Sequence, residues 1–259
     1  MKFFNGIKFF TDDSALINLG GTATASSAAD DAAEAFNGSR SFGWISDGEA
    51  DDTKTAYLER DFGTELYGDT LIIANHNLKT FSLKINGQSF ISYKVQTARN
   101  FSVVTFPYRD DIQKIRIEAS QTITPNAEKQ IGEVMLLSFI GQFEQPQELK
   151  NSLNREQGDL TLQNGKHFIF NCGQSWEFSL DIFSLSQNDI ELVRQLQDMG
   201  APFYMWPCGG EEGQFKYHFR PFLFDDFFKV AFSGKSQPNL KDNNYWTGLR
   251  DSVDLVEVE

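Results

Sequence analysis

The chain has few cysteines, few histidines and no long hydrophobic run. Its 259 residues include 2 Cys and 3 His. Cys172 and Cys208 are too few for a disulfide framework, and neither they nor His167 and His218 show the spacing of zinc ligands. No apolar stretch is long enough to span a bilayer, and the amino terminus does not have the pattern of a signal peptide. We therefore expect no metal, no cofactor and no membrane insertion.

Basic residues are scarce as well. The sequence has 23 Lys and Arg against 36 Asp and Glu, which gives a formal net charge of −13. A nucleic-acid partner needs clustered Lys and Arg to meet its phosphates. Here Lys114 and Arg116 instead alternate with apolar residues in a strand pattern. We expect no nucleic-acid partner.

Motifs of catalysis are also missing. The sequence contains no Gly-x-Ser-x-Gly elbow, no Walker loop and no Gly-x-Gly-x-x-Gly after a strand. The adjacent carboxylates at 110–111 and 225–226 would point to opposite faces of a strand, so neither pair fits a glycosidase. We predict no catalytic residues and a protein that is not an enzyme.

What the chain does contain is aromatic residues in strand-like patterns. It has 25 Phe, many of them in alternating or continuous apolar runs, which is typical of β-sheet cores. Period-2 alternation predicts strands at 57–62, 70–74, 80–85, 103–106, 114–119 and 133–139. Turn signals separate them at 75–77, at Asn86-Gly87 and at 107–111. Residues 1–141 are therefore predicted to form one mainly β domain.

The rest of the chain divides into a polar interval and a second domain. Residues 142–164 are rich in amides and poor in apolar side chains, which predicts a linker or extended arm. Residues 165–259 are predicted to be β-rich with one prominent helix. Ser186 is its expected N-cap, with Asp189 returning a bond in the manner of a capping box, and Gly200 followed by Pro202 ends it.

The most distinctive motif lies in residues 32–63. An alanine-rich segment ends in Phe36-Asn37-Gly38, a loop carries Trp44-Ile45-Ser46, and a strand closes on Asp61-Phe62-Gly63. Asn37-Gly38 is a turn pair that accepts positive φ. With the strands that follow to about residue 140, this succession resembles the discoidin or coagulation-factor C-type domain, a galactose-binding-like β-sandwich. The resemblance implies a jelly-roll sandwich that binds or displays rather than catalyses.

The same resemblance implies candidate carbohydrate contacts. Trp44 falls in a loop where discoidin-like sugar binders keep exposed aromatic rings for stacking, and Arg40 and His76 fall in neighbouring loop positions. Two alternatives stay open at this point. Trp44 could close the bottom of the core, and His76 could be a turn residue between two asparagines.

An acidic loop is the candidate cation site. Asp47, Glu49 and Asp51 could offer carboxylate oxygens to calcium, although the loop departs from the EF-hand pattern. Discoidin-like domains often bind calcium through backbone carbonyls and an Asp that is replaced by Asn37 in this chain. We therefore favour a solvated acidic loop, no metal, and weak or no dependence on calcium.

The second half carries another set of motifs. After the helix come a Gly-x-Pro-Phe-aromatic-x-Trp segment at 200–206, Arg-Pro-Phe at 220–222, Phe-Ser-Gly-Lys-Ser-x-Pro-Asn at 232–239, and Val-Glu-Val at 256–258. This succession resembles the carboxy-terminal module of bacteriophage tail and baseplate proteins. The resemblance implies a structural component of a tailed-phage virion, made in the host cytoplasm and placed in the tail. It would assemble the tail tip or baseplate through contacts with neighbouring tail proteins and with its own copies in a symmetric ring.

The runner-up function is a carbohydrate-binding receptor-recognition module, an adhesin whose partner is a host-surface glycan. For assembly, the candidate interface residues are aromatics flanked by Pro, Gly and Asn. They are Phe203, Tyr204 and Trp206 after the helix, and Tyr245 and Trp246 before the final strand. The alternative is that all of them pack inside their own domain.

Overall fold

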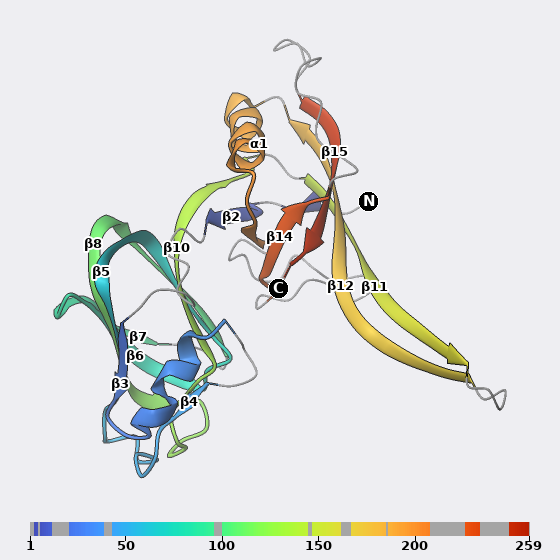
Figure 1. Ribbon diagram of the computed structural model, residues 1–259. Helices are drawn as coiled ribbons and strands as arrows, with labels where there is room; N and C mark the ends of the chain where they lie inside the picture. The colour runs from blue at the N-terminus through green and yellow to red at the C-terminus, as the bar shows by residue number, and fades with distance from the viewer. Residues whose placement is uncertain are drawn as a thin grey trace. The chain divides into compact units, whose positions relative to one another are not determined.

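The computed structural model describes residues 3–4, 6–11, 21–38, 43–95, 100–144, 147–161, 167–184, 186–207, 226–233 and 249–258. The chain divides into two units. The sandwich unit is Asp12–Phe139, and the discontinuous unit combines Met1–Thr11 with Ile140–Glu259. The predicted fold class is confirmed, since the chain is mainly β, with a sandwich followed by a β-rich unit that carries one α-helix (Figure 1). The first eleven residues, which we expected in the amino-terminal domain, belong to the discontinuous unit.

Two long strands form the centre of the sandwich unit. They are β5, Ala56–Ala74, and β8, Phe101–Thr122, which pair antiparallel with several register shifts between Asp61 and Thr70. Strands β3 and β10 also pair with β5, β6 pairs with β8, β7 pairs with β6, and β4 pairs with β9 in a separate ribbon. The bounds are β3 Thr22–Ala25, η1 Ala29–Phe36 (a 3₁₀ helix), β4 Trp44–Ile45, β6 Leu78–Ile85, β7 Gln88–Val95, β9 Gln130–Ile131 and β10 Glu133–Gln142.

The prediction of separate strands was wrong at two places. Residues 57–62 and 70–74 belong to one strand, β5, and residues 103–106 and 114–119 belong to one strand, β8. The predicted turn at 107–111 lies inside β8. Register shifts explain the difference, because extra residues in a strand let it bend without reversing.

The predicted turn at Asn86-Gly87 is confirmed. Both residues have positive φ, 50° and 78°, between β6 and β7. The Asn86 side chain also fastens the turn to β8: its Nδ2 donates to the carbonyl of Asp111, and its Oδ1 accepts from the backbone N–H groups of Gln113 and Lys114.

The core of the sandwich unit follows the predicted alternation. Leu58 and Phe62 are buried, whereas Tyr57, Glu59 and Asp61 are only partly covered. Among the described residues, the buried cluster that contains them runs from Ala25 to Leu136. The sandwich unit therefore has a hydrophobic core of its own.

The discontinuous unit is built on a sheet whose strands lie in the order β1-β11-β12-β15-β14-β13-β2. Its first and last strands come from the amino terminus, and β2 pairs with β13 through Tyr204↔Phe10. The bounds are β1 Phe3–Phe4, β2 Lys8–Thr11, β11 Gln147–Thr161, β12 His167–Ser184, β13 Phe203–Trp206, β14 Phe228–Phe232 and β15 Leu249–Glu257.

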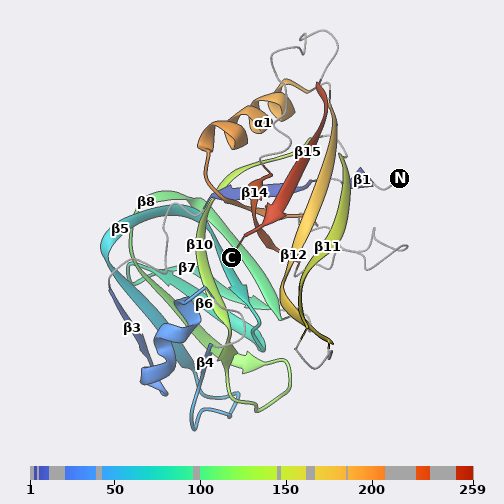
Figure 2. The same cartoon turned by 45° about the vertical axis from the view of Figure 1, so that its right-hand side comes forward.

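Most of the interval that we predicted as a linker or arm, 142–164, is strand β11. It pairs with β12 from Glu148↔Asp181 to Thr161↔His167. The polar composition misled the linker prediction, because ladder hydrogen bonds use the main chain and need no apolar side chain. Only Glu177–Ser184 of β12 pairs with β15. Figures 1 and 2 show β11 and β12 continuing together beyond β15, and we call this part the β11–β12 ribbon.

The predicted helix is confirmed as α1, Gln187–Met199. Gly200 ends it at φ 60°, and its N–H donates to the carbonyl of Gln197 at 3.2 Å. The apolar face of α1 packs into the core of the discontinuous unit, which also contains Phe203 and Met205. That face consists of Ile190, Leu192, Val193 and Leu196.

The capping-box prediction was wrong. Ser186 makes no side-chain cap bond, and its hydroxyl donates instead to Glu144 Oε2 at 2.5 Å. Asp189 is fully buried, and its Oδ1 accepts from the Glu144 backbone N–H at 2.8 Å. Asn188 Nδ2 donates to the other oxygen of Glu144. The side chains at the helix start therefore hold the chain segment after β10.

Within the described part of the chain, no helix has both the length and the apolar character needed to cross a bilayer.

Candidate functional site

Several described loops of the sandwich unit are joined by hydrogen bonds, and we call the end that they form the loop end. It comprises residues 26–28, 45–55, 75–77, 100 and 122–130. Hydrogen bonds join these segments: Asp52 N–H donates to Asn126 Oδ1, and the hydroxyl of Thr122 donates to Asp52 Oδ1. Asn77 Nδ2 donates to the carbonyl of Glu128, and His76 N–H to that of Asn100. The loop end is thus one connected surface.

Trp44 is part of the scaffold of this end. Its side chain is 0% exposed, and the indole Nε1–H donates to the carbonyl of Ser27 at 2.9 Å. The prediction that Trp44 stacks on a sugar is contradicted, because a sugar cannot reach a ring without exposed surface. The alternative interpretation, a tryptophan that closes the bottom of the core, matches the structure.

His76 is buried too, with 2% exposure. Its Nδ1 accepts from the Leu78 N–H at 3.0 Å, so Nε2 carries the proton and donates to Ser102 Oγ at 2.7 Å. Burial lowers the pKa of His76 to about 4, because desolvation disfavours the imidazolium. The predicted sugar contact through His76 is therefore wrong in this structure. Arg40, the other predicted contact, lies outside the described residues.

Three acidic side chains of the loop at 47–52, those of Glu49, Asp51 and Asp52, are hydrogen-bonded within the loop end. Glu49 Oε2 accepts from the hydroxyls of Ser26 and Ser27, at 2.7 and 2.9 Å. Asp51 Oδ1 accepts from Thr53 N–H at 2.8 Å, a bond that is the main cause of the lowered pKa of Asp51. Asp47 is exposed. Within the described residues, no three His, Cys, Asp or Glu side chains come together as metal ligands.

A lysine that our prediction missed lies under this loop. The side chain of Lys129 is 0% exposed, and its ammonium donates to the backbone carbonyls of Glu49 and Asp51. A lysine between Glu128 and Gln130 looks like a surface residue in the sequence. The only signal is that Lys129 shares the strand period with Ile131, which is also fully buried.

Around this scaffold, several polar groups and the apolar side chain of Ile45 face solvent. Ile45 is 50% exposed, and Asp47, Asn100 and Asn126 are exposed. Carboxylate and amide groups can accept from and donate to hydroxyl groups of a ligand, and an exposed aliphatic side chain can cover an apolar sugar face. The arrangement suits binding of a polyhydroxylated ligand.

The predicted interface aromatics lie mostly inside the molecule. Phe203 is 1% exposed and Trp206 is 3% exposed, so neither can anchor a partner in this structure. Tyr204 is partly buried and stacks on Phe227, with ring centres 5.2 Å apart. This outcome agrees with the alternative that they pack in their own domain. Tyr245 and Trp246 lie outside the described residues.

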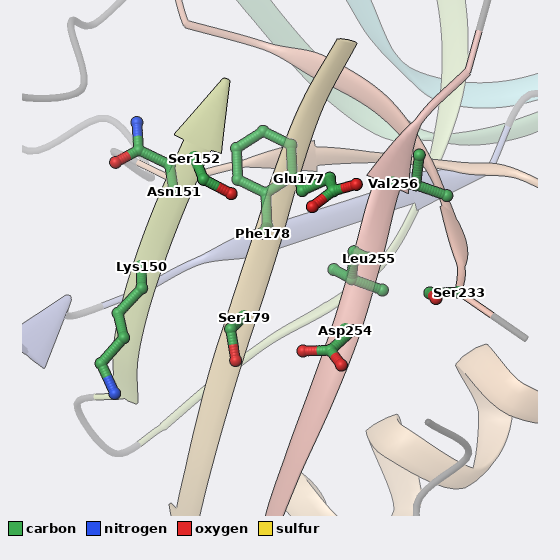
Figure 3. Close-up of a pocket in the computed structure, with 10 residues that line it drawn as sticks. All are labelled: Lys150, Asn151, Ser152, Glu177, Phe178, Ser179, Ser233, Asp254, Leu255 and Val256. Atoms are coloured by element: carbon green, nitrogen blue, oxygen red, sulfur yellow. The ribbon is translucent and has the colours of Figure 1, made fainter. Parts of the chain in front are cut away.

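The discontinuous unit has a shallow depression of about 290 Å³ on the sheet formed by β11, β12 and β15 (Figure 3). Ser179 and Asp254 lie opposite each other on neighbouring strands, and Lys150 on β11 pairs with Asp181 at 2.7 Å. The one aromatic residue in its lining, Phe178, is 1% exposed and belongs to the core. The depression is lined by both polar and apolar side chains, and it offers hydroxyl and carboxylate groups without an exposed aromatic ring.

No protein-family model matches the chain, and no curated protein is detectably similar in sequence. Among solved structures, the chain is similar to a point mutant of chitosan-binding module 1 from a chitosanase/glucanase of Paenibacillus sp. IK-5, at 18% identity and a TM-score of 0.40, over 47% of this chain and 97% of that one. It is also similar to the family 32 carbohydrate-binding module of NanJ from C. perfringens in complex with galactose (20% identity, TM-score 0.39, 46% and 93% covered). A third similar structure is the lectin domain of lectinolysin complexed with Lewis B antigen (16% identity, TM-score 0.35, 48% and 97% covered).

Proposed function

We propose that the sandwich unit, as a discoidin-like module, binds a carbohydrate at its loop end. The observation that carries this proposal is the rigid scaffold under an exposed polar surface. Trp44, His76 and Lys129 are buried and hydrogen-bonded, so the loops above them are held in one arrangement before any ligand arrives. Binding then costs little ordering entropy, which favours affinity for a small polar ligand.

The ligand contacts we assign are Asp47 and Asn100 for sugar hydroxyls and Ile45 for an apolar sugar face. Ile45 and Asp47 are exposed on one segment of this end, 45–55, and Asn100 is exposed on another. They replace Trp44 and His76, the residues that the sequence pattern indicated. The carbohydrate function is the runner-up function of the sequence, and it needs no catalytic group.

A glycan array followed by calorimetry on the full chain tests this function. We expect at least one neutral glycan to bind, and Asp47→Ala or Asn100→Ala to weaken its affinity about tenfold or more, because each variant removes hydrogen bonds to the ligand. Asp110→Ala is the matched control, since it removes an exposed carboxylate from the middle of β8. Absence of binding to any glycan contradicts the function. Binding that both loop-end variants leave unchanged places the site elsewhere.

A second candidate function is assembly, and the β11–β12 ribbon favours it. Beyond Leu153 and Trp176, the described residues of β11 and β12 pair only with each other. A two-stranded ribbon is marginally stable in water, and its free edges are ready to pair with another strand. A partner such as a second copy or a neighbouring protein of a tail tip or baseplate would stabilise it. The virion location itself stays a proposal.

The assembly function has its own test. Replacing residues 154–175 by an Asn-Gly turn removes the ribbon and keeps the part of β12 that pairs with β15. We expect the intact chain to form oligomers at micromolar concentration in light scattering, and the shortened chain to be monomeric with an unchanged circular dichroism melting curve. A monomeric intact chain at all accessible concentrations contradicts self-assembly through the ribbon.

A further inference from the structure

A buried ammonium needs hydrogen-bond acceptors, because an uncompensated charge inside a protein is strongly unfavourable. Lys129 meets this need with backbone carbonyls. Its Nζ donates to the carbonyl oxygen of Asp51 at 2.9 Å and to that of Glu49. A positive charge therefore lies beneath a loop whose side chains include Asp47, Glu49, Asp51 and Asp52.

The carboxylates of this loop have other partners. Glu49 accepts from two serine hydroxyls, Asp51 from Thr53 N–H, and Asp52 from the hydroxyl and N–H of Thr122. A divalent ion would need several of these oxygens as ligands at 2.3–2.6 Å. The residues present do not fit such an ion, because the loop carbonyls hold an ammonium and most loop carboxylates hold protein donors.

The position of the ammonium is fixed through the backbone of Lys129. Its N–H donates to Ser46 Oγ at 2.9 Å, and its carbonyl accepts from Ser46 N–H at 2.8 Å. The neighbouring Glu128 carboxylate accepts from the Ser46 hydroxyl at 2.6 Å and from Glu49 N–H at 3.2 Å. The bond from Ser46 is the main cause of the lowered pKa of Glu128. Residues 46–52 and 128–129 thus form one hydrogen-bonded unit.

We propose that the ammonium of Lys129 is the built-in cation of the loop end, taking the place of a bound metal ion and making the loop conformation independent of calcium. A cation tethered by the chain is present at a high effective concentration, so no free ion is needed to hold the carbonyls of Glu49 and Asp51 together. The single charge suits two neutral carbonyl ligands. This inference does not depend on carbohydrate binding.

Two measurements on the unaltered chain test it. We expect the melting temperature to change by less than about 1 °C between EDTA and millimolar calcium, since no native site gains free energy from the ion. We also expect Lys129 to resist acetylation by an amine-reactive ester, read by mass spectrometry, while the exposed Lys54 and Lys79 react. A calcium-specific rise of several degrees overturns the proposal, and so does acetylation of Lys129 at the rate of Lys79.

A variant tests the role of the charge. Lys129→Ala should lower the melting temperature by about 5 °C or more, and n-propylammonium chloride should restore part of that loss, because it replaces the missing atoms of the side chain. Tetramethylammonium chloride, which has no N–H donor, is the salt control, and Lys79→Ala is the protein control. Equal effects of both salts, or an unchanged melting temperature in Lys129→Ala, contradict the proposal. If Lys129→Ala does not fold, calcium and acetylation data on the unaltered chain still decide the question.

Discussion

At the scale of single residues, burial distinguishes the residues that support the loop end from those that can contact a ligand. Trp44 and His76 carry the functional groups that the sequence pattern pointed to, yet both are hydrogen-bonded below the surface. Ile45 and Asp47, their neighbours in sequence or space, are exposed instead. A residue type that is common in binding sites can therefore either support the loops from below or contact a ligand. Only the exposure of its side chain distinguishes the two roles.

The buried histidine predicts a specific dependence of stability on pH. Above pH 6.5, His76 is neutral in both the folded and the unfolded chain, so its contribution is complete. Between pH 6.5 and about 4, the unfolded chain binds a proton that the folded chain does not, and stability falls by about 1.4 kcal/mol per pH unit. We expect His76→Gln to reduce the slope of unfolding free energy against pH in this window, measured by urea denaturation.

Carboxylates also make the folded chain less stable as the pH falls, so the test of His76 needs a control for them. Hydrogen bonds lower the pKa of groups such as Asp51 and Glu128, so their contributions are also lost as the pH falls. They are present in both the parent chain and the His76→Gln variant. The difference between the two slopes therefore belongs to His76, and identical slopes would show that the imidazole titrates freely in the folded chain.

At the scale of elements, the start of α1 is held by tertiary contacts. Asp189 is buried and accepts from the Glu144 backbone N–H, whereas the Ser186 hydroxyl bonds an exposed carboxylate oxygen. We expect Asp189→Ala to lower the free energy of unfolding by about 1–3 kcal/mol, since it leaves that N–H without its acceptor. Ser186→Ala should lower the free energy of unfolding by less than about 1 kcal/mol. Gln195→Ala, on the exposed face of α1, serves as the control. Urea denaturation measures all three, and a larger loss for Ser186→Ala would restore a capping role.

The small β4–β9 ribbon offers a second prediction at this scale. A Cβ on Gly43 would lie 2.2 Å from the carbonyl oxygen of Ile131 and 2.5 Å from the Cα of Gly132, so the backbone must move. We expect Gly43→Ala to cost more than about 2 kcal/mol of unfolding free energy. Gly48→Ala is the comparison, because nothing lies within 4 Å there and only its φ of +73° is strained, a cost of about 1 kcal/mol. Equal losses would mean that β4 and β9 are free to separate.

The elements also show where sequence reasoning succeeds. Local chemistry predicted the turn at Asn86-Gly87 and the end of α1 at Gly200, because positive φ selects these residue types without reference to the rest of the chain. The bends of β5 and β8 depend on register with a partner strand, which no local pattern records. The burial of Lys129 depends on acceptors about 80 residues away in sequence, so alternation alone could only hint at it.

At the scale of the whole molecule, the two hydrophobic cores are separate sets of residues. Among the described residues, the buried cluster around Leu58 lies within the sandwich unit, and the cluster around Val230 lies within the discontinuous unit. We expect two calorimetric transitions on heating. Leu58→Ala should lower the temperature of the sandwich unit's transition by several degrees, and Val230→Ala that of the discontinuous unit's transition. The reason is that each variant opens a cavity in one core only. A single transition that moves with either variant contradicts independent cores.

The discontinuous unit was the part of the architecture that the sequence could not predict. A linear division at 142–164 follows composition, whereas the pairing of Phe10 with Tyr204 joins segments that share no local signal. Strand patterns predict that a strand exists, and they contain no information on which distant strand it joins. The strands that pair with β5 and β8 in the sandwich unit, by contrast, all come from one continuous stretch of the chain.

The pairing of β2 with β13 also sets an order of events during synthesis. Residues 8–11 leave the ribosome first, but their partners at 204–206 are made only after the whole sandwich unit. At about 5–20 residues per second, the first strand waits roughly ten seconds or more for its neighbour. The sandwich unit is complete in the meantime, and among the described residues its buried cluster uses none that is made later. We expect nascent chains stopped near residue 170 to contain a protease-resistant sandwich unit. In the same chains, a protease should still cleave the amino-terminal residues around β2.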